Sequence, residues 1–258
     1  MDRPQARLPH GYRLLHLDEV DSTNAEALRR AAGGERGPLW VWADSQLRGR
    51  GRQGRPWESR TGNLYASLLL ALPVSASASA GLSLAAPVAV RATLKALLPS
   101  NVPVDLKWPN DVLLPDGKVA GILLESIAGG ASTLVVIGCG INVRDAPAGT
   151  RYGATALARH GIDVSAQHVL EELARQMDDV LRLWNYGKDF ETIRRMWLDA
   201  GTGIGARISI KAGGETVEGI FEGLSTDGAL LLRPDSGALE VVRAGDVGMP
   251  VGGASQAS

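Results

Sequence analysis

The apolar positions of the chain fall into short runs and helical repeats that follow one another along most of its length. Runs rich in branched and aromatic residues, bounded by turn-forming clusters, predict strands at residues 14–17, 39–43, 63–72, 104–108, 112–114, 119–125 and 133–137. Helical spacing predicts a helix over about 22–33, a mostly apolar one over 81–98, an amphipathic one over 165–186 and a last one over 188–199. Pro87 lies inside the second helix and predicts a break or kink there.

The pattern changes after Gly201. Strand-like segments at 206–212, 216–224, 229–233 and 238–243 alternate with Gly213-Gly214, Asp227-Gly228 and Asp235-Ser236-Gly237. Turns at this density are typical of a small β-barrel, so we predict a second, C-terminal module. The small-residue tail at 252–258 is expected to be disordered.

The first helix begins at Asp21-Ser22-Thr23-Asn24. Thr23 with Glu26 three residues later has the spacing of a capping box. The hydroxyl and amide groups here have two interpretations. They cap the helix, and they also offer hydrogen bonds to a polar ligand at a helix N-terminus. The sequence leaves both open.

Composition limits the class of protein. The 258 residues are enough for one large domain with or without a small module, and the 45% hydrophobic and 21% charged content is ordinary for a globular protein. The net charge of −1 gives no global field for nucleic acid. Cys139 is the only cysteine, so no disulfide can form within the chain. The first residues contain no signal-peptide core and no uninterrupted apolar run reaches membrane length, which predicts a cytoplasmic protein.

Positive charge gathers in one segment, Gln46 through Trp57. It contains Arg48, Arg50, Arg52 and Arg55 among three glycines. Arginine forks suit phosphate and carboxylate, and we expect a loop that is loose when empty and becomes ordered around an anion. A solvated basic loop, or one that binds nucleic acid, is the alternative. Its position between two predicted core strands favours a cover over a ligand.

Three further segments carry candidate chemistry. Lys107-Trp108-Pro109-Asn110-Asp111 puts a cation, an aromatic ring, an amide and a carboxyl group at the end of a strand, although a capped turn explains them as well. Lys118 follows a tight turn and precedes Gly121, where the absence of a side chain allows close approach. Gly138-Cys139-Gly140-Ile141-Asn142 exposes backbone and offers an amide, and Cys139 is interpreted as a small buried filler.

Taken together, these segments resemble the biotin–protein ligase family. The resemblance covers Asp21–Asn24, Gln46–Trp57, Lys107–Asp111, Lys118–Leu123 and Gly138–Asn142 in the family's order and spacing. It implies an α+β fold, in which a mixed β-sheet flanked by helices forms a class II synthetase-like catalytic domain over residues 1–200. An SH3-like β-barrel with a disordered tail is implied over 201–258. Arg48, Gln53 and Cys139 occupy positions that vary in the family.

The resemblance also implies a two-step acyl transfer, in which biotin and ATP give biotinyl-5′-AMP and a lysine of a biotin carboxyl carrier protein then takes the biotinyl group. Arg52 and Lys118 are the implied catalytic residues, and Asp111 is the implied ligand of Mg²⁺. The implied biotin-binding residues are Ser22, Thr23, Asn24, Gln46, Arg50, Gly51, Arg52 and Lys118. The implied ATP-binding residues are Arg50, Arg52, Arg55, Trp57, Lys107, Asn110, Asp111 and Asn142.

About 13 residues precede the first predicted strand, too few for the DNA-binding domain that some family members carry. We therefore expect the ligase-only form, without a DNA or membrane partner. The family includes monomers and homodimers, and the sequence leaves that choice open. Two other functions are weighed: a lipoate–protein ligase of related fold, and a nucleic-acid-binding protein, which the slightly acidic net charge disfavours.

Overall fold

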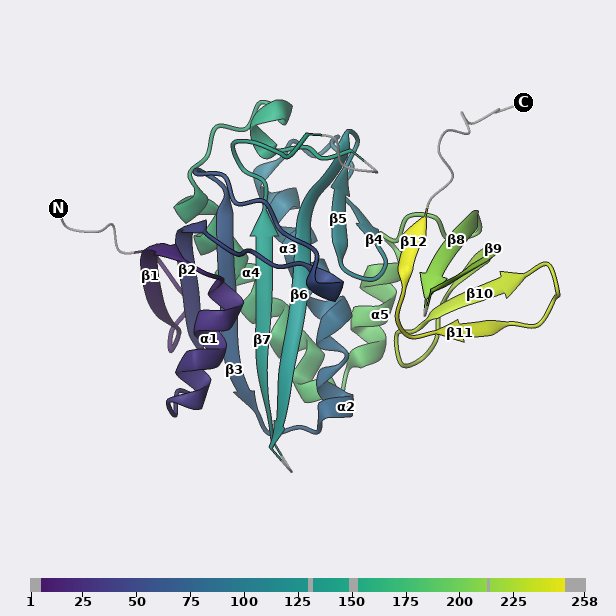
Figure 1. The fold of residues 1–258 in the computed structure, drawn as a ribbon, viewed down its shortest axis with the longest axis horizontal. Helices are drawn as coiled ribbons and strands as arrows, with labels where there is room; N and C mark the ends of the chain where they lie inside the picture. Colours follow the sequence, from purple (N-terminus) through teal and green to yellow (C-terminus); the bar gives the residue numbers. More distant parts are fainter. Residues whose placement is uncertain (1–5, 130–131, 149–152, 213, 249–258) are drawn as a thin grey trace.

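A computed structural model describes residues 6–129, 132–148, 153–212 and 214–248. Its centre is a seven-stranded mixed sheet in the order β1-β2-β3-β7-β6-β5-β4 (Figure 1). The first pair, β1 and β2, is parallel, and every other neighbouring pair in this sheet is antiparallel. The strands are β1 (Arg13–Val20), β2 (Leu39–Gln46), β3 (Leu64–Leu72), β4 (Asp105–Lys107), β5 (Asp111–Leu114), β6 (Gly117–Gly129) and β7 (Ser132–Ile141).

Helices cover both faces of this sheet. On one face lies α1 (Thr23–Ala32), and on the other lie α3 (Leu82–Leu97) and α4 (Ala166–Trp184), with α5 (Phe190–Leu198) beside them and the short α2 (Ala76–Ser79) before α3 (Figure 1). Single 3₁₀ turns occur at η1 (Arg52–Gly54), η2 (Leu157–His160) and η3 (Asn185–Gly187).

Alternate side chains of the central strands point to opposite faces of the sheet and contribute to two hydrophobic cores, one on each face. In β2, Leu39 and Val41 pack with Ala27 of α1, while Trp40 and Trp42 belong to the larger core on the opposite side. Successive side chains of a strand point to opposite faces, so a strand covered on both sides has a continuous apolar sequence. This explains why the 39–43 segment shows no polar alternation.

A second, five-stranded sheet follows, with all of its pairs antiparallel and the order β11-β10-β9-β8-β12. Its strands are β8 (Arg207–Ala212), β9 (Glu215–Leu224), β10 (Leu230–Pro234), β11 (Glu240–Val242) and β12 (Asp246–Gly248). The predicted fold class, a helix-flanked mixed sheet followed by a small β-domain, is thereby confirmed. The three residues of β12 were not predicted as a strand, and the predicted disordered tail lies outside the described residues.

The two sheets share one hydrophobic core. Ile208, Phe221 and Leu232 of the second sheet join the same buried cluster as Leu106 of β4. The backbone N–H of Leu106 donates to the carbonyl of Ala200. The division at residue 200 therefore stays a prediction about domain organisation, because packing is continuous across it.

Two local predictions about helices were wrong. Ser22, not Thr23, is the N-cap of α1, since its hydroxyl accepts from the N–H of Ala25. Glu26 pairs with Arg29 and Arg30 of its own helix instead of completing a capping box. A single α3 runs through Pro87, a buried residue inside the helix, so the predicted break is absent, while a kink there stays a prediction.

The stretch Ala76–Leu97, which spans α2 and α3, is the one helical segment among the described residues that is long and apolar enough to cross a membrane. Of its most apolar window, 56% is buried inside the protein. A buried core helix meets the same criteria, so this segment carries no argument for a membrane.

Candidate active site

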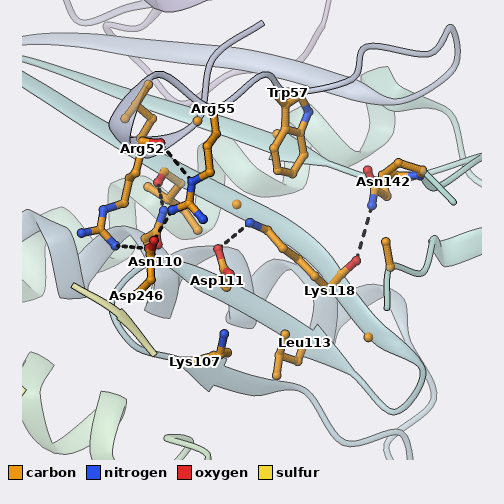
Figure 2. Close-up of a pocket in the computed structure, with 18 of the residues that line it drawn as sticks. Arg52, Arg55, Trp57, Lys107, Asn110, Asp111, Leu113, Lys118, Asn142 and Asp246 are labelled. Atoms are coloured by element: carbon orange, nitrogen blue, oxygen red, sulfur yellow. Dashed lines mark hydrogen bonds and ion pairs between the residues drawn. The ribbon is translucent and has the colours of Figure 1, made fainter. Parts of the chain in front are cut away.

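A cavity of about 1300 Å³ opens at one end of the seven-stranded sheet, between the loop that follows β2 and the second sheet. Each site residue predicted from the sequence lines it, from Ser22 through Asn142. The structure therefore brings together segments that are separated by more than a hundred residues in the chain. Figure 2 shows the part of the cavity where the charged side chains converge.

At one end of the cavity, buried polar groups form a connected network at the N-terminus of α1. Gln46 Oε1 accepts from the backbone N–H of Thr23 at 2.9 Å and lies 3.1 Å from its hydroxyl. Ser67 of β3 lies 2.8 Å from the Thr23 hydroxyl and donates to Asn24 Oδ1 at 2.6 Å. Ser22 supplies the helix cap, as the first of the two interpretations has it, and Thr23 and Asn24 line the cavity, where binding of a ligand stays a prediction. Ser67 was not predicted as part of this cluster.

Asn24 also connects this network to β6. Its Nδ2 donates to Glu125 Oε2 at 2.7 Å and to the carbonyl of Leu123 at 3.3 Å. The space it needs comes from Gly138, since a Cβ at that position would lie 2.1 Å from Asn24 Oδ1. The glycine therefore admits a side chain of the protein itself.

Two more glycines form a shelf beneath Trp57. Gly121 of β6 and Gly140 of β7 are directly paired across the two strands. A Cβ on Gly121 would lie 2.8 Å from Cζ3 of the Trp57 ring, and one on Gly140 would lie 2.6 Å from Cε2. The indole thus rests on side-chain-free backbone, and its Nε1 is buried with no hydrogen-bond partner among the described residues. The closing aromatic of the arginine loop is a fixed wall of the cavity.

Lys118 stands beside this wall. Its Nζ lies 5.1 Å from the centre of the Trp57 ring and forms an ion pair of 2.6 Å with Asp111 Oδ1 (Figure 2). The side chains of Lys118 and Asp111 are 29% and 21% exposed, so the pair is partly shielded from water. A cation held between an aromatic face and a carboxylate is well placed to meet an incoming anion.

The amides near Lys118 serve the local fold. Asn110 Nδ2 donates to the carbonyl of Ile122 at 2.6 Å, which ties the end of β4 to β6. Asn142 Nδ2 donates to the carbonyls of Thr155 and Lys118, at 3.0 and 3.4 Å. Both side chains thus brace the backbone around Lys118, and their predicted contacts with nucleotide stay predictions.

The arginine loop is docked on the second sheet. Arg55 Nη2 donates to Asp246 Oδ1 at 2.6 Å (Figure 2). Arg52 Nη1 donates to the carbonyl of Gly245 at 3.1 Å. Burial lowers the pKa of the Arg52 guanidinium and the nearby Asp246 opposes that shift. The expectation of a loose loop assumed that no anion of the protein organises these arginines. Asp246 overturns that premise, while mobility itself stays a prediction.

The C-terminal module also contributes residues to the cavity. Ser209, Lys211, Asp246 and Gly248 line the cavity, and Asp246 holds the loop. In the sequence, Asp246 is marked only by the glycine that precedes it, in a short segment for which no strand was predicted. Such a signal is too common to identify a partner 191 residues away in the chain.

Cys139 lies between the glycines that receive Asn24 and Trp57, but it points into the large core and is 3% exposed. Burial raises the pKa of its thiol to about 12. Cys139 is therefore buried as predicted, and the raised pKa of its thiol disfavours a thiolate at this position.

The described residues contain no group of three or more His, Cys, Asp or Glu side chains that could hold a metal ion by themselves. Asp111 is the predicted metal ligand. Magnesium is commonly bound through one or two carboxylates together with substrate phosphates and water. A single carboxylate fits that mode and does not fit a metal site built by the protein alone.

Comparison with known proteins identifies the class. The model of the biotin/lipoate A/B protein ligase family matches residues 17–142, and that of the biotin protein ligase C terminal domain matches residues 203–249. The biotin–[acetyl-CoA-carboxylase] ligase of Paracoccus denitrificans is 37% identical over 237 residues, which cover 90% of this chain and 98% of that protein. The corresponding ligase of Mycobacterium tuberculosis is 34% identical over 92% of this chain and 89% of that protein.

The solved biotin protein ligase of Aquifex aeolicus, in complex with biotin and ATP, has a TM-score of 0.75 and 28% identity over 91% of this chain and 97% of that one. The bifunctional ligase/repressor BirA of Escherichia coli is 34% identical over 85% of this chain and 68% of that protein. The chain therefore belongs to the biotin–protein ligase family.

The glycine shelf generates a prediction. In Gly140→Ala the new Cβ would lie 2.6 Å from Cε2 of Trp57, too close for the ring to stay where it is. The indole should therefore be displaced, and the arginine loop should lose its anchor. We expect trypsin to cleave after Arg50 and Arg52 several times faster than in the unsubstituted protein. Gly51→Ala is the matched control, since its Cβ meets nothing closer than 3.6 Å. Equal cleavage of Gly140→Ala and Gly51→Ala would contradict the anchoring role of the shelf.

Cys139 generates a second prediction. With a pKa near 12 the group remains a thiol at about pH 8, where alkylation requires a thiolate. The folded protein should resist iodoacetamide, whereas the protein unfolded in guanidinium chloride should gain one adduct by mass spectrometry. Rapid labelling of the folded protein would show that Cys139 is accessible and ionised.

Proposed function

We propose that the protein activates biotin with ATP to biotinyl-5′-AMP and then transfers the biotinyl group to a lysine of a biotin carboxyl carrier protein. The observation that carries the proposal is the arrangement within one cavity. The hydroxyl and amide cluster at the N-terminus of α1, the Lys107–Asp111 segment, and the cations Arg50, Arg52 and Lys118 all line the same cavity. A single small ligand usually fills 300–1,000 Å³, so about 1300 Å³ suits two substrates together.

The central cations explain how two anions can meet. In the first step a carboxylate oxygen of biotin bonds to the α-phosphorus of ATP, and the bond to the bridging oxygen breaks as pyrophosphate leaves. Carboxylate and triphosphate repel each other, and preorganised positive groups cancel that repulsion at the reacting atoms. Arg52 and Lys118 are the proposed catalytic residues, and Arg50 supports them.

The hydroxyl and amide cluster suits the uncharged ureido ring of biotin. Ser22, Thr23, Asn24 and Gln46 provide donors and acceptors at the N-terminus of α1, and all four lie within the cavity wall. A ligand that displaces some of the hydrogen bonds within this cluster has to replace them with its own, which favours a ring carrying both donors and acceptors. Gly51 places loop backbone beside this end.

The nucleotide end combines a flat ring with charge. Trp57, Lys107, Asn110 and Asn142 provide its walls, and Arg55 faces the proposed triphosphate position. Asp111 would hold Mg²⁺ together with the phosphates. When bound, Mg²⁺ neutralises charge on the leaving pyrophosphate.

In the second step a lysine amine of the carrier protein attacks the carbonyl carbon of the mixed anhydride. The C–O bond to AMP breaks, and the amine loses a proton as the amide forms. The arginine loop, held at Trp57 and at Asp246, keeps water from the anhydride until the lysine arrives. A carrier domain of a biotin-dependent carboxylase in the cytoplasm is the proposed partner.

The experiment that tests the function combines the protein with ATP, Mg²⁺, a biotin carboxyl carrier domain, and either biotin or lipoate. We expect the carrier domain to gain the mass of one biotinyl group and to gain nothing from lipoate. Transfer of lipoate alone would establish the related ligase activity, and absence of both transfers would refute the proposal.

Lys118→Ala provides a prediction about the first step. The substitution removes a cation at the carboxylate–phosphate junction, where loss of one charge-assisted contact costs about 1.5–3 kcal/mol or roughly ten- to a hundredfold in rate. Its ion pair with Asp111 is partly exposed and worth about 1 kcal/mol or less, so the melting temperature should fall by only a few degrees.

Formation of biotinyl-AMP is measured from biotin and labelled ATP. Lys95→Ala, at an exposed position near the end of α3, is the matched control and should react at the normal rate. A normal rate for Lys118→Ala would show that Lys118 is only a structural partner of Asp111.

A further inference from the structure

Glu125 of β6 contacts two residues that line the cavity, Asn24 and Arg50, and neither the sequence motifs nor the proposed reaction gives it a role. Its Oε2 accepts from Asn24 Nδ2 at 2.7 Å, and its Oε1 lies 3.7 Å from Arg50 Nη2. One carboxyl group therefore contacts the polar cluster with one oxygen and faces the arginine loop with the other.

The contact with Asn24 fixes the direction of a hydrogen-bond chain. Both hydrogens of Asn24 Nδ2 go to β6, to Glu125 Oε2 and to the carbonyl of Leu123, so its Oδ1 must face Ser67 as an acceptor. Ser67 has one hydroxyl hydrogen and gives it to Asn24. The Thr23 hydroxyl, 2.8 Å from Ser67, has its own hydrogen directed to Gln46 Oε1 at 3.1 Å. The orientation of Asn24 and Ser67 is thus set from the Glu125 end.

The contact with Arg50 is of a different kind. At 3.7 Å it is an ion pair without a close hydrogen bond, and the two side chains are 44% and 29% exposed. Pairs of this exposure contribute little to folding stability. They can hold a flexible guanidinium over a cavity and release it when a stronger anion arrives, since few contacts have to break.

We propose that Glu125 is a positioning residue that keeps Arg50 over the cavity and, through Asn24, couples the biotin end to the arginine loop. This inference rests on the proposed function. Arg50 then meets the reacting anions from a prepared position, which saves the ordering of a long side chain at the moment of reaction. In this role Glu125 does not contact the reacting atoms. It acts through Asn24 and Arg50, the two residues that it contacts.

The experiment tests the two contacts of the Glu125 carboxyl group, with Asn24 and with Arg50, separately. In Glu125→Gln the carbonyl oxygen of the new amide can still accept from Asn24, while its NH₂ group faces Arg50 and cannot attract it. We expect the affinity for biotin without ATP to change less than about threefold. Biotinyl-AMP formation should slow by about tenfold, the order expected when one charge-assisted contact is lost.

A double-mutant cycle shows whether Glu125 acts through Arg50. In an Arg50→Gln background, adding Glu125→Gln should cause no further loss of rate, because the partner is already absent. Independent, multiplying effects would overturn the inference, as would a faster rate in Glu125→Gln. Glu19→Gln, which removes an exposed carboxyl at the end of β1, is the matched control.

The same assays distinguish this inference from the proposed function. If the unsubstituted protein forms no biotinyl-AMP, the proposed function fails. If it forms biotinyl-AMP and Glu125→Gln matches it in both rate and affinity, only the role of Glu125 fails. A melting temperature within about 3 °C of the unsubstituted protein excludes general destabilisation as the cause of a slower rate.

Discussion

The structure depends on pairing the cations of the cavity with carboxyl groups of its own. Lys118 pairs with Asp111, and Arg52 and Arg55 converge on Asp246 (Figure 2). Arg50 faces Glu125. Without these partners, four positive side chains in one cavity would repel one another and disperse into water. Each pair is partly exposed and individually weak. The set therefore keeps the cations in place and still allows substrate anions to replace the carboxyl groups.

Backbone without side chains is the second constraint. Gly138 makes room for Asn24, and the paired Gly121 and Gly140 receive the ring of Trp57. These glycines lie on β6 and β7, the two longest strands of the sheet, which are buried between neighbours. The glycines of β6 and β7 hold the ring of Trp57 and so anchor the arginine loop at that residue. The arginine side chains of the loop stay partly exposed. Positioning on strands rather than on loops gives the site its precision.

The second sheet completes this arrangement. Its apolar residues continue the large core, and β12 carries Asp246 to the arginine loop. The same small domain therefore stabilises the fold and closes one side of the cavity. Trp108 reinforces the connection, since its Nε1 donates to the carbonyl of Gly228 at 3.4 Å. Separation of the chain into a catalytic part and a passive appendage does not fit these contacts.

The sequence by itself determined the strands and helices with strong apolar patterns, and the segments that line the cavity, because periodicity and unusual local chemistry are written in consecutive residues. It also predicted correctly that Cys139 is buried. Only the tertiary structure decided that Gly121, Gly138 and Gly140 accept Trp57 and Asn24, and that Ser22 is the N-cap of α1. Asp246, Glu125 and Ser67 entered the site in the same way. Single polar residues in ordinary strands carry no local signal, and their partners are fixed by sheet order and domain packing rather than by neighbours in the chain.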